Sequence, residues 1–420
     1  MRVHLVIVSS LRCESRRFIL FVSEAHPILG GGKRMRFSFV KYHINSHSET
    51  EIIVIFVSLR KTKRMTTKRL PIGISDFKEL IESKSYFIDK SDFIRAVIEE
   101  GSKITMLPRP RRFGKTLNLS MLRYFFEKTE GNVYHPLFEG LGIEQWKDFQ
   151  KYQGNYPVVM LSLKDCKGDA FEKTLEQLGV ELKEEYKRHQ YLLNDELNLS
   201  DRRTFECILN QSANEIQLQN GLNLLVNLLA THHSASVIVL LDEYDSPIHV
   251  AYDRGYYQQM IDFIRTFMST VFKDNPNVLR GVITGILRVS MESLFSGLNN
   301  IGVKSILDLP MSTSFGFTQE ETTVLLSGYG LSQQQEAVKE WYDGYLFGGT
   351  TIYNPWSLLN FVDAKGIFAP YWVNTGSDVL LRSLIADGPT IVRKEMETFL
   401  SGGSIRCVIN ERWEHSLCDQ

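Results

Sequence analysis

Residues 109–117 place a glycine, a lysine and a threonine in an order that can hold phosphate. An apolar run leads into this loop, and an amphipathic, helix-forming stretch follows it. The first turn of a helix attracts anions, because its backbone N–H groups are unpaired and carry the positive end of the helix dipole. Gly114 would let the backbone approach phosphate closely, Lys115 would reach the β- and γ-phosphates, and the Thr116 hydroxyl would bind Mg²⁺.

The loop departs from the usual phosphate-binding pattern, which has a glycine five residues before Gly114. Arg109 stands at that position, and Arg111 and Arg112 follow it. Because one guanidinium group can donate to two phosphate oxygens at once, each of the three arginines could bind phosphate. Taken alone, the segment could also be an ordinary basic turn before a helix. The predicted nucleotide-binding residues are Arg111, Arg112, Phe113, Gly114, Lys115, Thr116 and Leu117.

A second constellation lies at residues 237–243, where a continuous apolar run ends in two acids, Asp242 and Glu243. Such a run is typical of a buried strand in a parallel sheet. Open α/β sheets bind their ligands at the carboxyl ends of the strands. We therefore predict that Asp242 holds Mg²⁺ and that Glu243 polarises an attacking water. The alternative is a strand capped by solvated acids.

Two more candidates lie at the end of the next predicted strand, residues 278–284, and just after it. Thr284 ends that strand, where a polar side chain can contact the γ-phosphate or the attacking water. Arg288 could stabilise charge that develops on the phosphoryl group. As alternatives, Thr284 would cap a strand end and Arg288 would be a surface cation. The predicted catalytic residues are Glu243, Arg288 and Thr284, and the predicted metal ligands are Thr116 and Asp242.

Eight ordered segments of the chain resemble the AAA-ATPase-like family of bacterial proteins. The resemblance runs from about Leu70 to about Leu400, and the arginine-rich loop is the usual form in that family. It implies a phosphate-loop ATPase that uses ATP and Mg²⁺. The segments are residues 70–77, 86–90, 109–117, 242–248, 284–290, 295–300, 341–345 and 353–357.

Members of that family commonly carry a C-terminal nuclease domain of the PD-(D/E)XK type. Such a nuclease needs an acid on one strand and Glu-x-Lys on the next, so that the carboxylates share a metal. The candidates Glu181-x-Lys183 and Glu185-x-Lys187 lie in a helix-patterned stretch, where charge pairs on an exposed helix are expected instead. The tail, residues 401–420, is too short for the domain. We expect the nuclease to be missing, through truncation or a reading-frame break.

Strand and helix patterns alternate along the middle of the chain. The predicted strands are residues 104–107, 156–163, 237–242, 278–284 and 306–309. The predicted helices are residues 75–80, 92–99, 117–126, 170–229 with a break near 194–200, and 258–272. This alternation predicts an α/β fold, with a P-loop NTPase core built on a parallel sheet that helices cover on both faces.

We expect three parts of the chain. They are an N-terminal extension at residues 1–64, an AAA-like ATPase core at residues 65–316 and a mainly helical C-terminal subdomain at residues 317–420. The extension is rich in arginine, lacks the family's segments and has no secretory signal pattern. It is either an upstream segment from a misassigned start codon or a genuine small β-rich cap.

The composition is that of a soluble globular enzyme, since 43% of the 420 residues are hydrophobic and 23% are charged. The formal net charge of −1 gives no global attraction for nucleic acid, so a nucleic-acid partner would need a local contact. The five cysteines are scattered and form no Cys-x-x-Cys pair, which indicates neither a disulfide framework nor a zinc site. No apolar run approaches the ~20 residues of a membrane span. We expect a cytoplasmic protein.

The predicted function is Mg²⁺-dependent ATP hydrolysis, in which the nucleotide state moves the helical subdomain and a protein partner that the sequence does not identify. One alternative is a nucleotide-binding interaction module without hydrolysis, which the arginine-rich loop would suit. A further alternative is a truncated remnant of an ATPase–nuclease fusion.

Overall fold

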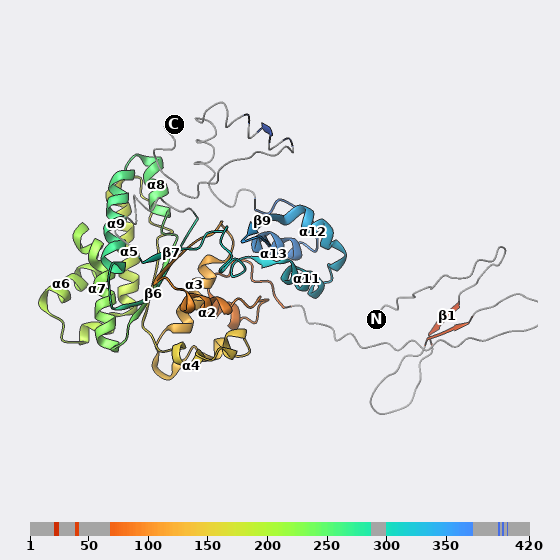
Figure 1. Ribbon diagram of the computed structural model, residues 1–420, viewed down its shortest axis with the longest axis horizontal. Helices are drawn as coiled ribbons and strands as arrows, with labels where there is room; N and C mark the ends of the chain where they lie inside the picture. Colours follow the sequence, from red (N-terminus) through yellow and green to blue (C-terminus); the bar gives the residue numbers. More distant parts are fainter. Residues whose placement is uncertain are drawn as a thin grey trace, which may run out of the picture. The chain divides into compact units, whose positions relative to one another are not determined.

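The computed structural model describes residues 21–24, 38–41, 68–286 and 300–372, together with residues 394, 397, 398 and 401. The chain divides into two units, Met1–Met65 and Thr66–Gln420. In the first unit, β1 (Phe21–Glu24) and β2 (Ser38–Lys41) form an antiparallel pair. All the elements described below belong to the second unit (Figure 1).

A five-stranded, fully parallel sheet lies at the centre of the second unit, in the spatial order β4-β5-β6-β3-β7. Both β3 and β5 are buried along their whole length, as strands covered on both faces should be. The predicted α/β fold with a parallel sheet is therefore confirmed. The strands are β3 (Ile104–Pro108), β4 (Val158–Ser162), β5 (Val237–Asp242), β6 (Val278–Gly285) and β7 (Ile301–Val303).

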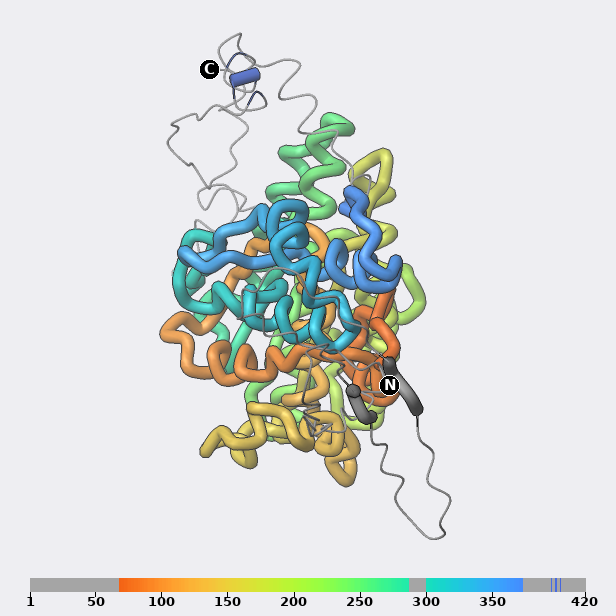
Figure 2. The backbone as a smooth tube through the Cα atoms, turned by 90° about the vertical axis from the view of Figure 1, so that its right-hand side faces the viewer, coloured from red at the N-terminus to blue at the C-terminus, as the bar shows by residue number. Residues whose placement is uncertain are grey.

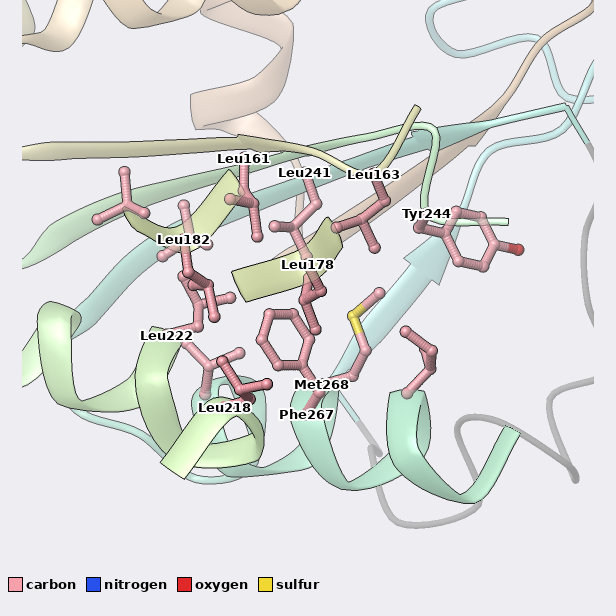
Figure 3. Close-up of a cluster of buried hydrophobic side chains, with 14 of the residues drawn as sticks. Leu161, Leu163, Leu178, Leu182, Leu218, Leu222, Leu241, Tyr244, Phe267 and Met268 are labelled. Atoms are coloured by element: carbon pink, nitrogen blue, oxygen red, sulfur yellow. The ribbon is translucent and has the colours of Figure 1, made fainter. Parts of the chain in front are cut away.

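One face of the sheet is covered by long helices that follow β4 and β5. Leucines of these helices pack against Leu161 of β4 and Leu241 of β5, together with Phe267 and Met268 (Figure 3). The predicted helical region 170–229 is broken as expected, by the 3-10 turn Gln190–Asn194. The helices are α5 (Phe171–Arg188), α6 (Leu199–Leu209), α7 (Glu215–His233), α8 (Ser246–Arg254) and α9 (Tyr257–Phe272).

The opposite face carries the helices that precede and follow β3 (Figure 1). Ile238 and Leu240 of β5 pack on this side, because successive residues of a strand point to opposite faces. The helices are α1 (Phe77–Glu82), α2 (Asp92–Glu99), α3 (Lys115–Phe126) and α4 (Phe149–Tyr152), with 3-10 turns at Glu130–Asn132, His135–Phe138 and Gly142–Gln145.

The C-terminal segment, residues 317–372, has its own small hydrophobic core. It is mainly helical, as expected, but it also contains a three-stranded antiparallel sheet in the order β8-β10-β9, which was not predicted. Its elements are β8 (Phe317–Thr318), α11 (Gln319–Gly328), the 3-10 turn Ser332–Gln334, α12 (Gln335–Tyr342), β9 (Asp343–Phe347), β10 (Thr350–Tyr353) and α13 (Pro355–Asp363).

The C-terminal segment lies beside the beginning of the core (Figure 2). The Tyr329 hydroxyl donates to the carbonyl oxygen of Lys68 over 2.6 Å, and Lys90 forms an ion pair of 2.7 Å with Glu321. Residues 86–90, one of the segments that resemble the family, therefore help to attach the C-terminal segment.

One predicted strand is wrong. Residues 306–309 form a turn and a bend, and β7 at Ile301–Val303 supplies the strand that pairs with β3. The misleading pattern is apolar at three positions, Ile306, Leu307 and Leu309, yet Leu307 and Leu309 are exposed. Apolar residues in a surface turn can imitate a short strand, because periodicity over four residues carries little information.

The outer edge of β4 is covered by charged side chains of α5. The Met160 N–H donates to Glu185 over 2.9 Å, and Arg188 donates to the Val158 carbonyl oxygen over 2.5 Å. Arg188 also pairs with Glu185 and Glu127. Although burial alone would raise it, the pKa of Glu185 is lowered to about 2 by Arg188 and His189. Glu185 is 7% exposed, so the expectation of an exposed charge pair was wrong at this residue.

Candidate functional site

The chain turns sharply between β3 and α3, where residues 109–114 form the predicted loop. Gly114 has a φ of +81°, and Arg112 has a φ of +69°. The left-handed region costs a residue with a side chain about 1–2 kcal/mol, so glycine suits the position directly before the helix. The turn brings Gly114, Lys115 and Thr116 to the wall of a cavity.

This cavity has a volume of about 1080 Å³ and lies at the carboxyl ends of the strands. Its wall includes the phosphate loop, the start of α3, the ends of β4 and β5, and part of α8. Two further parts of the wall come from regions distant in sequence, namely residues 71–75 and the side chains of Trp356 and Leu359 on α13. The core and the C-terminal segment both line this site.

Lys115 is buried at the start of α3, with its Nζ 3.0 Å from the carbonyl oxygens of both Arg109 and Pro110. Burial lowers the pKa of Lys115, and the nearby carboxylates of Asp245 and Asp242 oppose that shift. The hydrogen bonds of this ammonium thus go to neutral oxygens of its own loop. Charge-assisted bonds to an anion would be stronger.

Asp242 brings together three of the predicted residues. It is 1% exposed and ends β5. The Thr116 hydroxyl donates to Asp242 Oδ2 over 2.6 Å, and the Thr284 hydroxyl donates to Oδ1 over 2.5 Å. Residues from α3, β5 and β6 therefore meet at one carboxylate, because the parallel strands place their carboxyl ends at the same edge of the sheet.

Glu243 directly follows Asp242 and also lines the cavity. Its φ of +50° is unusual for a residue with a side chain. The Ser246 hydroxyl, in the first turn of α8, donates to Glu243 Oε2 over 3.1 Å. Ser246 therefore holds one oxygen of the carboxylate that the sequence indicated as a base, and sequence reasoning did not identify this partner.

The three loop arginines have different positions. Arg111 and Arg112 are exposed and line the cavity, and the Arg112 guanidinium lies 4.3 Å from the centre of the Trp356 ring. Arg109 is 0% exposed, and it donates to the carbonyl oxygens of Lys304 and Met311. Burial lowers its pKa to about 10. The expectation that Arg109 could meet phosphate is wrong, because the side chain is fully buried and its Nη1 and Nη2 donate to these carbonyls.

Phe113 and Leu117, the two apolar residues among the predicted binding residues, lie on opposite sides of Gly114. The Phe113 ring is buried against Tyr345 and Phe347, with its centre 4.8 and 5.2 Å from theirs. It does not line the large cavity. Leu117 lines the cavity. The remaining candidate, Arg288, lies outside the described residues.

The oxygen donors at Thr116 and Asp242 fit Mg²⁺, which takes one or two protein oxygens and completes its shell with water and phosphate. Among the described residues, no group of three or more His, Cys, Asp or Glu could hold a metal ion. A magnesium ion here would therefore depend on oxygens of a bound phosphate.

Sequence reasoning missed several residues of the cavity wall, among them Ile74, Ser246, Trp356 and Leu359. A signal was present for three of them. Residues 70–77, 242–248 and 353–357 are segments that resemble the family, and they include Ile74, Ser246 and Trp356. Segments that recur in a family yet lie far apart in the sequence can meet at one site.

Comparison with known proteins identifies a family and a relative that this chain resembles. A family model described as AAA-ATPase-like, "Predicted AAA-ATPase", matches residues 71–295. This range includes the phosphate loop, the two acids at the end of β5 and Thr284 of β6. A protein of Azotobacter chroococcum mcd 1, described as "Uncharacterized protein in vnfD 5'region", is 29% identical over 328 residues. The alignment covers 77% of this chain and 57% of that protein, so the chain spans somewhat more than half the relative's length. In the part of the chain that the structure describes, no helix is long and apolar enough to cross a membrane.

Proposed function

Because this chain belongs to the predicted AAA-ATPase family, we propose that its cavity binds ATP with Mg²⁺ and hydrolyses it to ADP and phosphate. The observation that carries this proposal is the meeting of the Thr116 and Thr284 hydroxyls at Asp242, next to the buried ammonium of Lys115. These groups come from three separate elements and converge at the edge of the sheet where such folds bind ligands.

The phosphate groups would lie against the first turn of α3. The amides after Gly114 and the Lys115 ammonium would donate to the β- and γ-phosphate oxygens. Lys115 already lies at this wall, where carbonyl oxygens hold it in place. Arg111 and Arg112 line the same cavity and could add bidentate contacts to phosphate.

Thr116 and Asp242 would hold Mg²⁺, which when bound neutralises charge on the β- and γ-phosphates. The present hydrogen bond between these two residues places their oxygens 2.6 Å apart, so both can face one ion. Thr284 would keep the Asp242 carboxylate oriented through its own hydrogen bond.

Glu243 would accept a proton from the attacking water. The water oxygen then bonds to the γ-phosphorus while the bond to the ADP oxygen breaks. Ser246 would keep the carboxylate of Glu243 in position. Arg288 stays in this proposal as the residue that stabilises charge on the transferring group.

We also propose the division into an extension at residues 1–64, a core at residues 65–316 and a C-terminal subdomain at residues 317–420 that responds to the nucleotide. The Arg112–Trp356 and Phe113–Tyr345 contacts support this coupling, because they attach the phosphate loop directly to the C-terminal segment. We propose that the protein acts in the cytoplasm and that its nucleotide cycle moves a protein partner, which the sequence does not identify.

A nucleotide-binding module without turnover is the second candidate, and Arg109 favours it. This residue replaces the first glycine of the usual loop, and hydrogen bonds to Lys304 and Met311 fix it. A loop anchored in this way has little freedom to rearrange during a reaction cycle.

Phosphate release from purified protein decides between the two candidates, with calorimetric titration of MgATP alongside it. We expect binding and Mg²⁺-dependent release of phosphate. Binding without release would establish the second candidate. A protein that binds neither MgATP nor magnesium tripolyphosphate would refute both.

A further inference from the structure

The pairing between β5 and β6 stops before β6 ends. Its last pair of opposite residues is Leu241 and Ile283, while β6 continues to Gly285. After Asp242 the chain leaves the sheet, because Glu243 takes a left-handed conformation with a φ of +50° and leads into α8. Backbone N–H groups that are removed from water need acceptors. At the end of β6 such an acceptor must come from a group other than the β5 strand itself.

The side chain of Asp245 supplies this acceptor. The N–H of Ile286, directly after β6, donates to Asp245 Oδ2 over 2.8 Å. One step earlier, the Tyr244 N–H donates to the Thr284 carbonyl oxygen over 3.1 Å. Asp245 is only 1% exposed, and a bond from an N–H to a carboxylate is stronger than one to a neutral oxygen. The residues after β5 thus continue its hydrogen bonds to β6 although the backbone has turned away.

Gly285 allows this close approach. A Cβ at Gly285 would lie 2.7 Å from Asp245 Oδ1 and 2.7 Å from Cε1 of the Tyr244 ring. Both distances are well below the ~3.5 Å at which non-bonded heavy atoms pack favourably. On the side of β3, the Gly285 carbonyl oxygen accepts from the Arg109 N–H over 3.0 Å. The end of β6 is therefore held from two sides, by the phosphate loop and by Asp245.

Thr284 is the functional residue that this arrangement places. It is 0% exposed, and its hydroxyl donates to Asp242 Oδ1 over 2.5 Å. Hydrogen bonds weaken steeply when their geometry is disturbed, so a shift of the end of β6 would loosen the Asp242 carboxylate. Asp245 itself does not line the cavity. Any influence of Asp245 on a ligand therefore passes through Thr284.

We propose that Asp245 is a positioning residue of the magnesium site, which fixes the end of β6 so that Thr284 keeps Asp242 oriented. This inference rests on the proposed function, which places Mg²⁺ at Thr116 and Asp242. Groups that hold a metal ligand in place commonly change metal affinity by about 10–100-fold when they are removed. Asp245 stands one step behind Thr284, so its effect should be smaller than that of Thr284.

The first measurement needs no ligand. Hydrogen exchange in the full chain reports whether Asp245 holds the end of β6. Asp245→Ala removes the acceptor, so the Ile286 amide should exchange at least about tenfold faster. Asp245→Asn keeps an oxygen that can accept, and its exchange should stay within about threefold of wild type. If Asp245→Ala does not fold, Asp245→Ser takes its place, because serine is shorter but keeps a polar atom. Unchanged exchange in the shortened variant would overturn the inference.

The second measurement follows the ion. ATP is titrated calorimetrically in the presence of Mg²⁺ and in the presence of EDTA, and the ratio of the two dissociation constants gives the gain from Mg²⁺. Thr284→Val should reduce this gain at least about tenfold, Asp245→Ala at least about threefold and Asp245→Asn less than about twofold. The double variant should lose no more than Thr284→Val alone, because both residues act through one hydroxyl. Additive losses would overturn the route through Thr284.

The controls distinguish this inference from the function on which it rests. Asp262→Ala removes a carboxylate on α9 that is 53% exposed and pairs with Arg265, and it should change neither Ile286 exchange nor the gain from Mg²⁺. Wild type that binds ATP equally with Mg²⁺ and with EDTA would refute the proposed magnesium site, and this inference with it. Wild type that shows the gain, together with an Asp245→Ala variant that retains it in full, would overturn this inference alone.

Discussion

Two groups of buried charges lie within the same sheet framework, and their partners differ. At the edge of β4, Arg188 meets Glu185 and Glu127, and both Glu185 and Arg188 also bond to the β4 backbone. At the cavity, the Lys115 ammonium bonds to neutral carbonyls, and Asp242 accepts from two hydroxyls. In the first group opposite charges are hydrogen-bonded to each other, whereas in the second the hydrogen bonds of Lys115 and Asp242 go to neutral groups.

The difference teaches which buried charges are available to a ligand. An ion pair that is fully bonded inside the protein has nothing to gain from an outside ion, whereas removing one partner leaves a buried charge uncompensated. A cation that bonds to neutral oxygens loses less when it exchanges them for phosphate. Such a site is held at some expense of stability, as functional sites often are. The edge group should therefore control folding, and the cavity group should control binding and chemistry.

The largest effect expected is on stability. Arg188→Met removes the cation between Glu185 and Glu127 and should lower the free energy of unfolding by about 3–5 kcal/mol, as for other broken buried pairs. Denaturant titration measures the loss. The matched control is Lys173→Met on the same helix, because Lys173 pairs with Glu176 at the surface and should matter by less than about 1 kcal/mol. Similar losses in both variants would contradict the prediction that the buried ion pair stabilises the fold more than the surface pair does.

The charged group at the edge of β4 should also make the free energy of unfolding depend on pH. The folded-state pKa of Glu185 is about 2, below its ordinary value, so the unfolded state binds the proton more readily. The contribution of Glu185 is thus present above its ordinary pKa and is lost as the pH falls through about 2. The stability gap between wild type and Glu185→Gln should therefore narrow in acid. A gap that stays constant down to the lowest measurable pH would refute the pairing.

The next effect is on chemistry. Glu243→Gln should bind MgATP like wild type but release phosphate roughly 10²-fold more slowly, about 2.7 kcal/mol in the barrier, because it lacks the base. Single-turnover measurement separates this step from product release. Asp242→Asn serves as the contrast, since it should weaken binding and its dependence on Mg²⁺. If both variants lose affinity equally, the two acids do not have separate roles.

Lys115→Ala sharpens the comparison, because its effect on stability should be much smaller than that of Arg188→Met. MgATP binding should weaken at least tenfold, about 1.4 kcal/mol or more. Stability should change little, because burial of the ammonium opposes folding while its attraction to the carboxylates of Asp245 and Asp242 favours it. Calorimetry and denaturant titration give the two numbers. Unchanged affinity would remove the phosphate-loop interpretation.

The smallest effect should come from shortening the chain at its start. A chain that begins at Met65 keeps every residue of both charge groups, and the unit Thr66–Gln420 is compact by itself. Its thermal unfolding and MgATP affinity should differ from those of the full chain by less than about 1 kcal/mol. A loss of several kilocalories per mole would show that the N-terminal segment belongs to the fold.

The parallel sheet and the meeting of Thr116, Asp242 and Thr284 could be anticipated from the sequence. Continuous apolar runs predict buried strands, and the carboxyl ends of parallel strands share one edge. Other features depend on tertiary partners that periodicity does not encode. Arg109 donates to carbonyl oxygens 195 and 202 positions away, and Glu185 is buried only because α5 lies against the edge of β4. Leu359 belongs to the site only because α13 lies at the cavity, which the sequence pattern does not indicate.

The covered edge of β4 also bears on how copies of the protein behave together. An open strand edge offers N–H and C=O groups to any other strand and invites aggregation. Here the Tyr156 N–H donates to the Phe126 carbonyl oxygen just before β4, and Glu185 and Arg188 bond to the backbone further along. A foreign strand could pair with β4 only after breaking that ion pair. The salt bridge that secures the fold thus also acts as a gatekeeper against the growth of the sheet from one molecule into the next.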